Sequence, residues 1–327
     1  MTGARNQVSD SRFAALLMWL QRFGPPLWSQ YIRRHWSGQR FVIGIPYVWL
    51  LLFFVVPFLI VFKISFSEIR LAMPPYAPLI EKVGDLGYAV KLHFDNYAYL
   101  FTDELYISSY GYSVKVAAVS TLFCLLLGYP MAYAIARATP TQRSIYLLLI
   151  ILPFWTSFLL RVYAWIGLLK NDGVINQIIG LLGIPPLSLM YSDFAVYVGI
   201  VYSYLPFMIL PLYSNLEKHD LTLLEAAADL GARPMNAFFR ITLPLSMPGI
   251  VAGSLLVFIP AVGEYVIPSL LGRTDQLMIG RVLSDEFFAN RDWPVASSVA
   301  IAMLALLLIP IMIFQRYQNR ELAGARK

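Results

Sequence analysis

Glu264 is an ionisable side chain inside a long apolar stretch, and the chemistry open to it is the binding of a cation. The stretch begins near Gly249, so at about 1.5 Å of helix rise per residue the carboxyl group lies roughly 22 Å from its start. An ionised acid near the centre of a membrane helix costs on the order of 3 kcal/mol, so it should face a cavity or a partner. Two interpretations stand side by side. In the first, Glu264 is an anionic binding group for a cationic substrate. In the second, it is a structural carboxylate, which either pairs with a base such as Arg161 or is hydrogen-bonded within the bundle.

Aromatic rings form a second set of candidate pathway groups. The set is Trp155, Tyr163, Trp165, Tyr202 and Tyr204. Cation–π attraction would let such rings guide an alkyl diammonium ion without holding it tightly. The alternative is an aromatic belt at the membrane interface, where Trp and Tyr are enriched. Among these rings, the sequence most favours a role in transport for Trp155, which is followed by Thr156 and Ser157.

A polar interval at 214–248 carries a pattern of helix signals. Thr222 followed three residues later by Glu225 predicts a capping box, in which the two side chains satisfy backbone N–H groups at the start of a helix. Ala226 and Ala227 are strong helix formers with small side chains, which would allow a partner to approach closely. The interval is therefore predicted to begin with a short, rigid helix.

The same interval also contains a stop signal and a second start signal. Gly231 is suited to the left-handed turn that ends a helix, and Pro234 fits the first position of another. The second helix is predicted to end near Leu243 and Pro244. Taken alone, this pattern is typical of a solvated helical hairpin between two spans.

Membrane helices must position these residues, because 58% of the 327 residues are hydrophobic and only 13% are charged. A soluble domain cannot hide that much apolar surface. Runs of about 20 apolar residues cross a bilayer, and they must be helical because lipid offers backbone groups no partners. The six predicted spans are 41–62, 113–136, 144–166, 194–213, 249–271 and 294–314. The predicted fold class is an all-α integral membrane protein with six transmembrane helices.

The distribution of charge orients the spans. The net charge of +6 would suit a nucleic acid, but the basic residues concentrate in segments that alternate along the chain. With the N-terminus in the cytoplasm, the cytoplasmic segments carry an excess of Lys and Arg, and the outside segments carry slightly more acids than bases. This is the positive-inside pattern, so no nucleic-acid partner is expected. It places both termini and the 214–248 loop in the cytoplasm.

The residue inventory argues against catalysis by this chain. Cys124 is the one cysteine, the three histidines are scattered, and no Gly-Lys pair occurs that could belong to a phosphate-binding loop. We therefore expect no metal, no cofactor and no enzymatic activity.

The loop, written as spacing, is Glu225-Ala226-Ala227, three residues, Gly231, nine residues, then Ile241-x-Leu243-Pro244. This pattern resembles the cytoplasmic coupling-helix loop of the permease subunits of bacterial ABC importers, which sits in a cleft of the ATPase subunit. Further segments are similar to the polyamine (spermidine/putrescine) importer permeases, and within that group to the putrescine permeases in particular. These segments are 45–65, 151–165, 258–264, 278–283 and 290–297. The resemblance runs from about Gln39 to the C-terminal tail and is weaker over the basic N-terminal segment.

The resemblance implies a type I-like importer permease in the bacterial inner membrane. Its parts would be a basic cytoplasmic tail (1–40), a six-helix permease domain (41–315, with the coupling loop at 214–248) and a cytoplasmic C-terminal tail (316–327). The implied partners are a second homologous permease, two ATPase subunits that hydrolyse ATP, a periplasmic polyamine-binding protein, the lipid bilayer and the polyamine. The ATPase-coupling residues would be Thr222, Glu225, Ala226, Ala227, Gly231 and Pro234, and the pathway residues Glu264, Trp155, Tyr163 and Tyr204.

An alternative from another class is an ion-coupled secondary transporter of organic cations that works alone, with Glu264 as the coupling site. Dependence on an ATPase subunit separates the two functions. Between putrescine and spermidine, the sequence leaves both substrates open.

Overall fold

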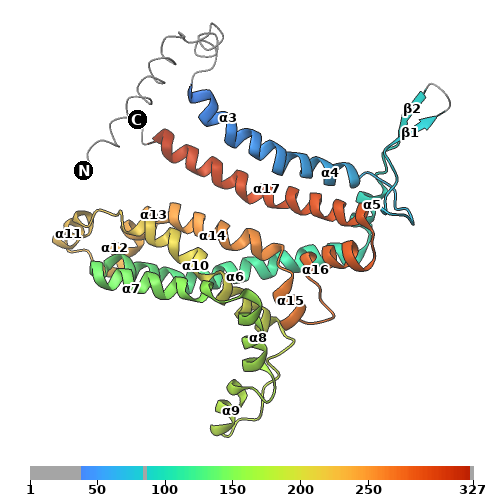
Figure 1. The fold of residues 1–327 in the computed structure, drawn as a ribbon. Helices are drawn as coiled ribbons and strands as arrows, with labels where there is room; N and C mark the ends of the chain where they lie inside the picture. The colour runs from blue at the N-terminus through green and yellow to red at the C-terminus, as the bar shows by residue number, and fades with distance from the viewer. Residues whose placement is uncertain (1–37, 84–86, 325–327) are drawn as a thin grey trace, which may run out of the picture. The chain divides into compact units, whose positions relative to one another are not determined.

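The computed structural model describes residues 38–83 and 87–324 (Figure 1). The chain divides into two compact units after Val61, and each is described by itself. Most of the predicted basic tail, and the last three residues of the C-terminal tail, lie outside the described residues. The first unit is a run of helix made of α3 (Gly38–Leu50), the π-helical η1 (Leu51–Val55) and most of α4 (Val56–Ile64). The run Val42–Ile64 has a mean hydropathy of 2.6 in its most apolar window, where no residue is buried. It is therefore suited to a lipid environment.

The second unit is built mainly of helices. After the end of α4, its elements in chain order are β1 (Ile80–Val83), β2 (Gly87–Val90), α5 (Asp95–Thr102), α6 (Glu104–Arg137), α7 (Pro140–Ile151), the 3-10 turn η2 (Leu152–Trp155), α8 (Phe158–Leu169), α9 (Val174–Leu181), α10 (Asp193–Leu216), α11 (Thr222–Asp229), α12 (Pro234–Ala237), the π-helical η3 (Phe238–Thr242), α13 (Leu243–Leu245), α14 (Met247–Val262), α15 (Val266–Leu271), α16 (Ile279–Ser284), the π-helical η4 (Asp285–Ala289) and α17 (Trp293–Gly324). The antiparallel β1–β2 hairpin lies in the first loop predicted outside, and the other elements named here are helical, as the predicted all-α class requires.

The centre of this unit is formed by α6, α10 and α14, which lie side by side (Figure 1). Glycines let these helices approach closely around Met208 of α10. A Cβ atom at Gly253 would lie 2.8 Å from Met208 Sδ, and one at Gly128 would lie 3.1 Å from Met208 Cγ. Small residues at helix contacts are the usual means of close packing in membranes, where burial of apolar surface does not drive helices together.

Four helices are long and apolar enough to cross a membrane, in the part of the chain that the structure describes. They are Val42–Ile64, Glu104–Arg137, Asp193–Leu216 and Trp293–Arg316, and the count rises to six if each of two bent helix pairs is one span. The bent pairs are Pro140–Trp155 with Phe158–Leu181, bent by 90°, and Pro234–Leu245 with Met247–Val262, bent by 63°. The sequence therefore predicted the position of four spans, while the other two predicted spans are not single straight helices.

The predicted span 144–166 is wrong as one helix, because the chain bends by 90° between α7–η2 and α8–α9. Pro153 has no backbone N–H, and the segment tightens into a 3-10 turn that ends at Trp155. Thr156 then leaves the helix with extended dihedrals, and its Oγ1 donates to the carbonyl of Pro153 at 2.7 Å. In Figure 1, α8 and α9 accordingly turn away from the α6–α10–α14 bundle.

The predicted span 249–271 is also interrupted. Helix α14 ends at Val262, and α15 begins at Val266, so residues 263–265 form a break inside the span. The N-terminus of α16 closes against this break, since a Cβ at Gly280 would lie only 2.4 Å from the carbonyl oxygen of Gly263. Packing against α16 therefore fixes the backbone of the break, and no local sequence pattern predicts this contact.

Candidate functional site

The 214–248 loop has the predicted helix–turn–helix form, but its first helix begins differently. The predicted capping box between Thr222 and Glu225 is wrong, because Leu221 already has helical dihedrals and α11 has no side-chain cap at that position. Asp220 supplies the missing acceptor, with Oδ1 at 3.0 Å from the backbone nitrogen of Thr222. An acid before a helix N-terminus is favoured by the helix dipole. The hydrogen bond from the Thr222 N–H lowers the pKa of Asp220 below its usual value.

The predicted end of that helix is confirmed. Gly231 has a φ of +77°, its N–H donates to the carbonyl of Ala228 at 2.9 Å, and the next N–H donates to Ala227 at 2.9 Å. These two bonds form a Schellman motif, which requires the left-handed residue that glycine supplies. Pro234 is the first residue of α12, as predicted, and the second helical segment continues as far as Leu245.

The loop exposes a group of large apolar side chains that the sequence pattern did not reveal. We call these residues the loop patch; their exposed fractions are 47% for Leu221, 45% for Leu223, 89% for Leu230, 66% for Met235 and 56% for Phe239. Glu225 and Ala226 are exposed beside them, while Ala227 is half-buried. Exposed apolar patches on a polar segment mark sites of contact with another protein or with the membrane.

Glu264 lies in the break between α14 and α15 and is 7% exposed. Its Oε1 accepts the backbone N–H groups of Val266 at 3.1 Å and Ile267 at 3.3 Å, and its Oε2 accepts the hydroxyl of Tyr204. The carboxylate therefore caps α15 and ties it to α10. The salt bridges of the described residues do not include Glu264, so of the two structural alternatives the structure shows hydrogen bonding within the bundle and not pairing with Arg161.

Arg161, on the first turn of α8, contacts aromatic rings instead. Its guanidinium lies 5.2 Å from the ring centre of Phe154 and 5.6 Å from that of Phe158. Phe154 packs edge-on against Phe207 of α10 with ring centres 5.3 Å apart, and Phe207 lies 6.0 Å from Tyr204. A continuous series of aromatic contacts thus links the bend after α7 to the carboxylate of the second break.

The remaining predicted pathway rings lie apart from Glu264. Trp155 is 74% exposed and Tyr163 is 58% exposed. Neither has a hydrogen bond or ring contact with Tyr204 or Glu264 in the part of the chain that the structure describes. The structure therefore brings Tyr204 and Glu264 together directly and leaves Trp155 and Tyr163 as separate exposed rings.

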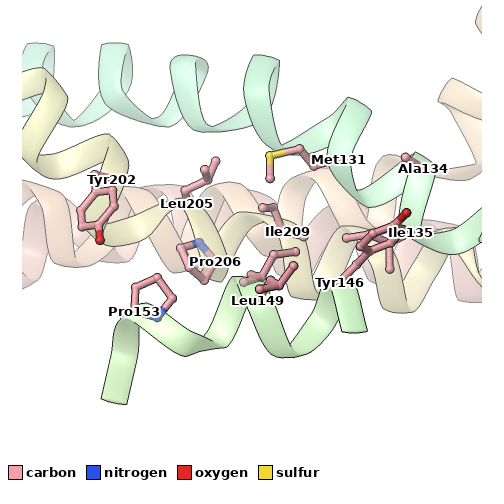
Figure 2. A pocket seen from close by; sticks show the side chains of 11 residues that line it. Met131, Ala134, Ile135, Tyr146, Leu149, Pro153, Tyr202, Leu205, Pro206 and Ile209 are labelled. Atoms are coloured by element: carbon pink, nitrogen blue, oxygen red, sulfur yellow. The ribbon is translucent and has the colours of Figure 1, made fainter. Parts of the chain in front are cut away.

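An apolar hollow of 420 Å³ lies between α6, α7 and α10 (Figure 2). Its lining includes Met131 and Leu149, with Pro206 and Ile209 from α10, and none of the lining residues is charged. Small-ligand sites combine apolar walls with a few convergent polar groups. This hollow offers an ammonium group no charged partner, only the rings and hydroxyl groups of Tyr146 and Tyr202.

Comparison with known proteins gives consistent matches over most of the chain. The family described as "binding-protein-dependent transport system inner membrane component" matches residues 39–324. The spermidine/putrescine transport system permease protein PotB of Haemophilus influenzae is 39% identical over 280 residues, which cover 85% of this chain and 93% of the relative. PotB of Escherichia coli is 38% identical over 272 residues, which cover 82% and 93%.

Two solved structures share the fold. They are a bacterial ABC transporter involved in the import of the acidic polysaccharide alginate, with a TM-score of 0.68, and a bacterial alginate ABC transporter in complex with an alginate pentasaccharide-bound periplasmic protein, with a TM-score of 0.69. Both are 16% identical in sequence and match 90% of this chain, covering 99% and 98% of their own chains.

Proposed function

This chain belongs to the family of binding-protein-dependent transport system inner membrane components, and on that premise we propose that it is a permease subunit of an ATP-driven polyamine importer. It forms half of the translocation pathway, with putrescine as the first substrate and spermidine as the second. The names of its 38–39% identical relatives support the substrate class. The excess of acids in the segments predicted outside suits a polycation, which they would attract.

The observation that carries the proposal is the loop patch. Five large apolar side chains are exposed on a polar segment that connects membrane helices, and the Schellman turn at Gly231 holds α11 and α12 at a fixed angle. We assign this surface to a cleft on an ATPase subunit. Thr222, Glu225 and Ala226 would contact the cleft, Ala227 would allow close approach, and Gly231 and Pro234 would fix the elbow. Closure of the ATPase then moves the loop and the helices on either side.

The assembly that follows contains a second homologous permease, two ATPase subunits and a periplasmic polyamine-binding protein. The chain lies in the bacterial inner membrane with its two tails, 1–40 and 316–327, in the cytoplasm around a permease domain at 41–315. ATP hydrolysis belongs to the separate ATPase subunits. The family match and the shared fold support this arrangement.

For the pathway, we propose that Glu264 acts on the cation through its field. Its three hydrogen-bond donors are neutral, so the negative charge has no counter-ion among the described residues. Such a charge favours a dication at the nearby surface of the bundle. Tyr204 fixes the carboxylate, while the exposed rings of Trp155 and Tyr163 offer cation–π contacts along the route.

The test is uptake of radiolabelled putrescine into proteoliposomes that contain the whole complex. Gly231→Pro and Glu225→Lys should abolish ATP-driven uptake while the chain still inserts and assembles with its partner permease. Lys218→Glu is the matched control, since Lys218 is an exposed residue of the same loop. Normal uptake by both loop variants would refute the coupling assignment. Uptake that continues without any ATPase subunit but stops with an uncoupler would instead support an ion-coupled carrier.

A further inference from the structure

The coupling loop is joined to α7 by an ion pair at its base. Glu217, the first residue after α10, accepts a hydrogen bond from Nη1 of Arg143 through Oε1. The guanidinium also donates from Nη2 to the carbonyl of Ala136 at 3.3 Å and lies 6.0 Å from the ring centre of Tyr213. Both side chains are partly shielded, with exposed fractions of 27% and 37%. The pair therefore connects the ends of α6, α7 and α10 at one point.

The two charges oppose the preferences of their own helices. Arg143 is the fourth residue of α7, where the positive end of the helix dipole favours an acid. Glu217 is the C-cap of α10, where the negative end favours a base. Local helix stability would place these charges the other way round, so it does not explain the pair. The explanation must lie in the contact between the two helices.

The other side of the loop is fastened by neutral groups. Nε2 of His219 lies 3.2 Å from Oδ1 of Asn215 and 3.1 Å from the carbonyl of Leu245, which joins the end of α10 to the end of α13. The hydroxyl of Tyr129 on α6 lies 2.9 Å from Oγ of Ser246, a buried contact at the start of α14. The loop base is thus bound to α6, α10 and α14 as one block, and Arg143 adds α7 to it.

We propose that Arg143 is a positioning residue of the coupling machinery: its pair with Glu217 carries displacement of the loop into α7 and from there into the α7–α8 bend. The bend carries the exposed Trp155, one of the predicted pathway rings, and Phe154, which contacts the guanidinium of Arg161. The inference rests on the proposed function and deepens it, because it names how the loop reaches a helix that does not adjoin it in sequence.

The experiment is charge reversal in the complete transporter, with two rates measured on the same proteoliposomes: putrescine uptake and ATP hydrolysis stimulated by the binding protein. Arg143→Glu and Glu217→Arg should each lower the uptake per ATP hydrolysed on the order of tenfold, within the range of coupling between two protein sites. The double variant Arg143→Glu/Glu217→Arg should restore the ratio to within about twofold, since it rebuilds the pair and agrees with both helix dipoles. Lys218→Glu, a charge reversal at the next residue, should leave the ratio unchanged.

Three results would overturn the inference. The single variants could keep a normal ratio, or the double variant could assemble but fail to restore it. The single variants could also lower only the amount of assembled complex, with a normal ratio in what remains, which indicates a structural role. Arg143→Gln and Glu217→Gln, which bring no like charges together, replace the reversals if these do not assemble. A wild-type complex without ATP-dependent uptake would refute the proposed function itself, which is a separate outcome.

Discussion

Replacement of Glu264 by Gln and by Ala separates the charge of this residue from its role as a helix cap. In Glu264→Ala the two N–H groups of the α15 cap and the hydroxyl of Tyr204 lose their acceptor. A buried donor without a partner costs about 1–3 kcal/mol, so the three together should destabilise the fold by at least about 3 kcal/mol. In Glu264→Gln the amide oxygen keeps both N–H bonds, and the amide nitrogen donates to the tyrosine oxygen. Each bond weakens by about 1 kcal/mol with loss of the charge, which is offset by the smaller cost of burying a neutral amide.

Uptake, unlike stability, should fall in both variants, because both lack the negative charge. Glu264→Gln removes one negative charge, and an ammonium group that passes about 7 Å away at an effective dielectric of about 20 loses about 2 kcal/mol of attraction, or roughly 30-fold in KM. The Gln variant should therefore assemble and unfold thermally like the parent protein but take up putrescine poorly. The Ala variant should lose both thermal stability and putrescine uptake. Tyr204→Phe, which leaves the charge and removes one donor, should cost about 1.5–3 kcal/mol of stability.

The assays are thermal unfolding of the purified complex and the putrescine concentration dependence of uptake in proteoliposomes. A Gln variant with the parent KM would refute the electrostatic role of Glu264. Equal losses of thermal stability in the Gln and Ala variants would refute the assignment of the cap, because the cap needs only an acceptor oxygen.

Three further predictions follow from the packing and the loop. Gly231→Val should lower ATP-driven uptake, because a non-glycine residue at a φ of +77° costs about 1–2 kcal/mol, whereas Gly231→Asn should be tolerated; equal uptake by both would contradict the role of the left-handed turn. Gly253→Ala should destabilise the complex by about 1–3 kcal/mol, since its Cβ would lie 2.8 Å from Met208 Sδ and 3.0 Å from Met208 O, while Gly111→Ala, with no atom within 4 Å, should not; thermal unfolding that ranks them otherwise would refute the close α10–α14 contact. Burial lowers the pKa of His219 below 6.5, and the charge of nearby Arg137 lowers it further, although the hydrogen bond to the Leu245 carbonyl acts in the opposite direction. His219 therefore binds fewer protons in the folded protein than in the unfolded chain. Its contribution to stability is complete above that value and is lost as the pH falls below it, and thermal unfolding between about pH 8 and about pH 5.5 should show a slope that His219→Gln reduces; an unchanged slope would contradict this.

Local signals predicted local structure well in this chain. The turn at Gly231 and the start of α12 at Pro234 depend on backbone preferences of single residues, and both are found where the sequence places them. The capping box failed because Asp220, two residues before Thr222, supplied a competing acceptor of the same kind. Several polar side chains near a helix start make the existence of the helix predictable, while the choice of cap depends on the path of the chain before it.

Composition and charge pattern also determined that this is a helical membrane protein, because an apolar chain in lipid must satisfy its backbone within each segment. The two breaks escaped prediction, since Pro153 occurs in a run that reads as continuous, while other prolines, such as Pro130 and Pro260, lie inside helices. Only the tertiary structure decided which side chains from distant parts of the sequence pair with each other. Tyr204 meets Glu264 across 60 residues of sequence, and Arg143 meets Glu217 across 74. Such pairs depend on how helices pack, and helix packing is set by the shapes of whole surfaces, which no spacing along a single segment contains.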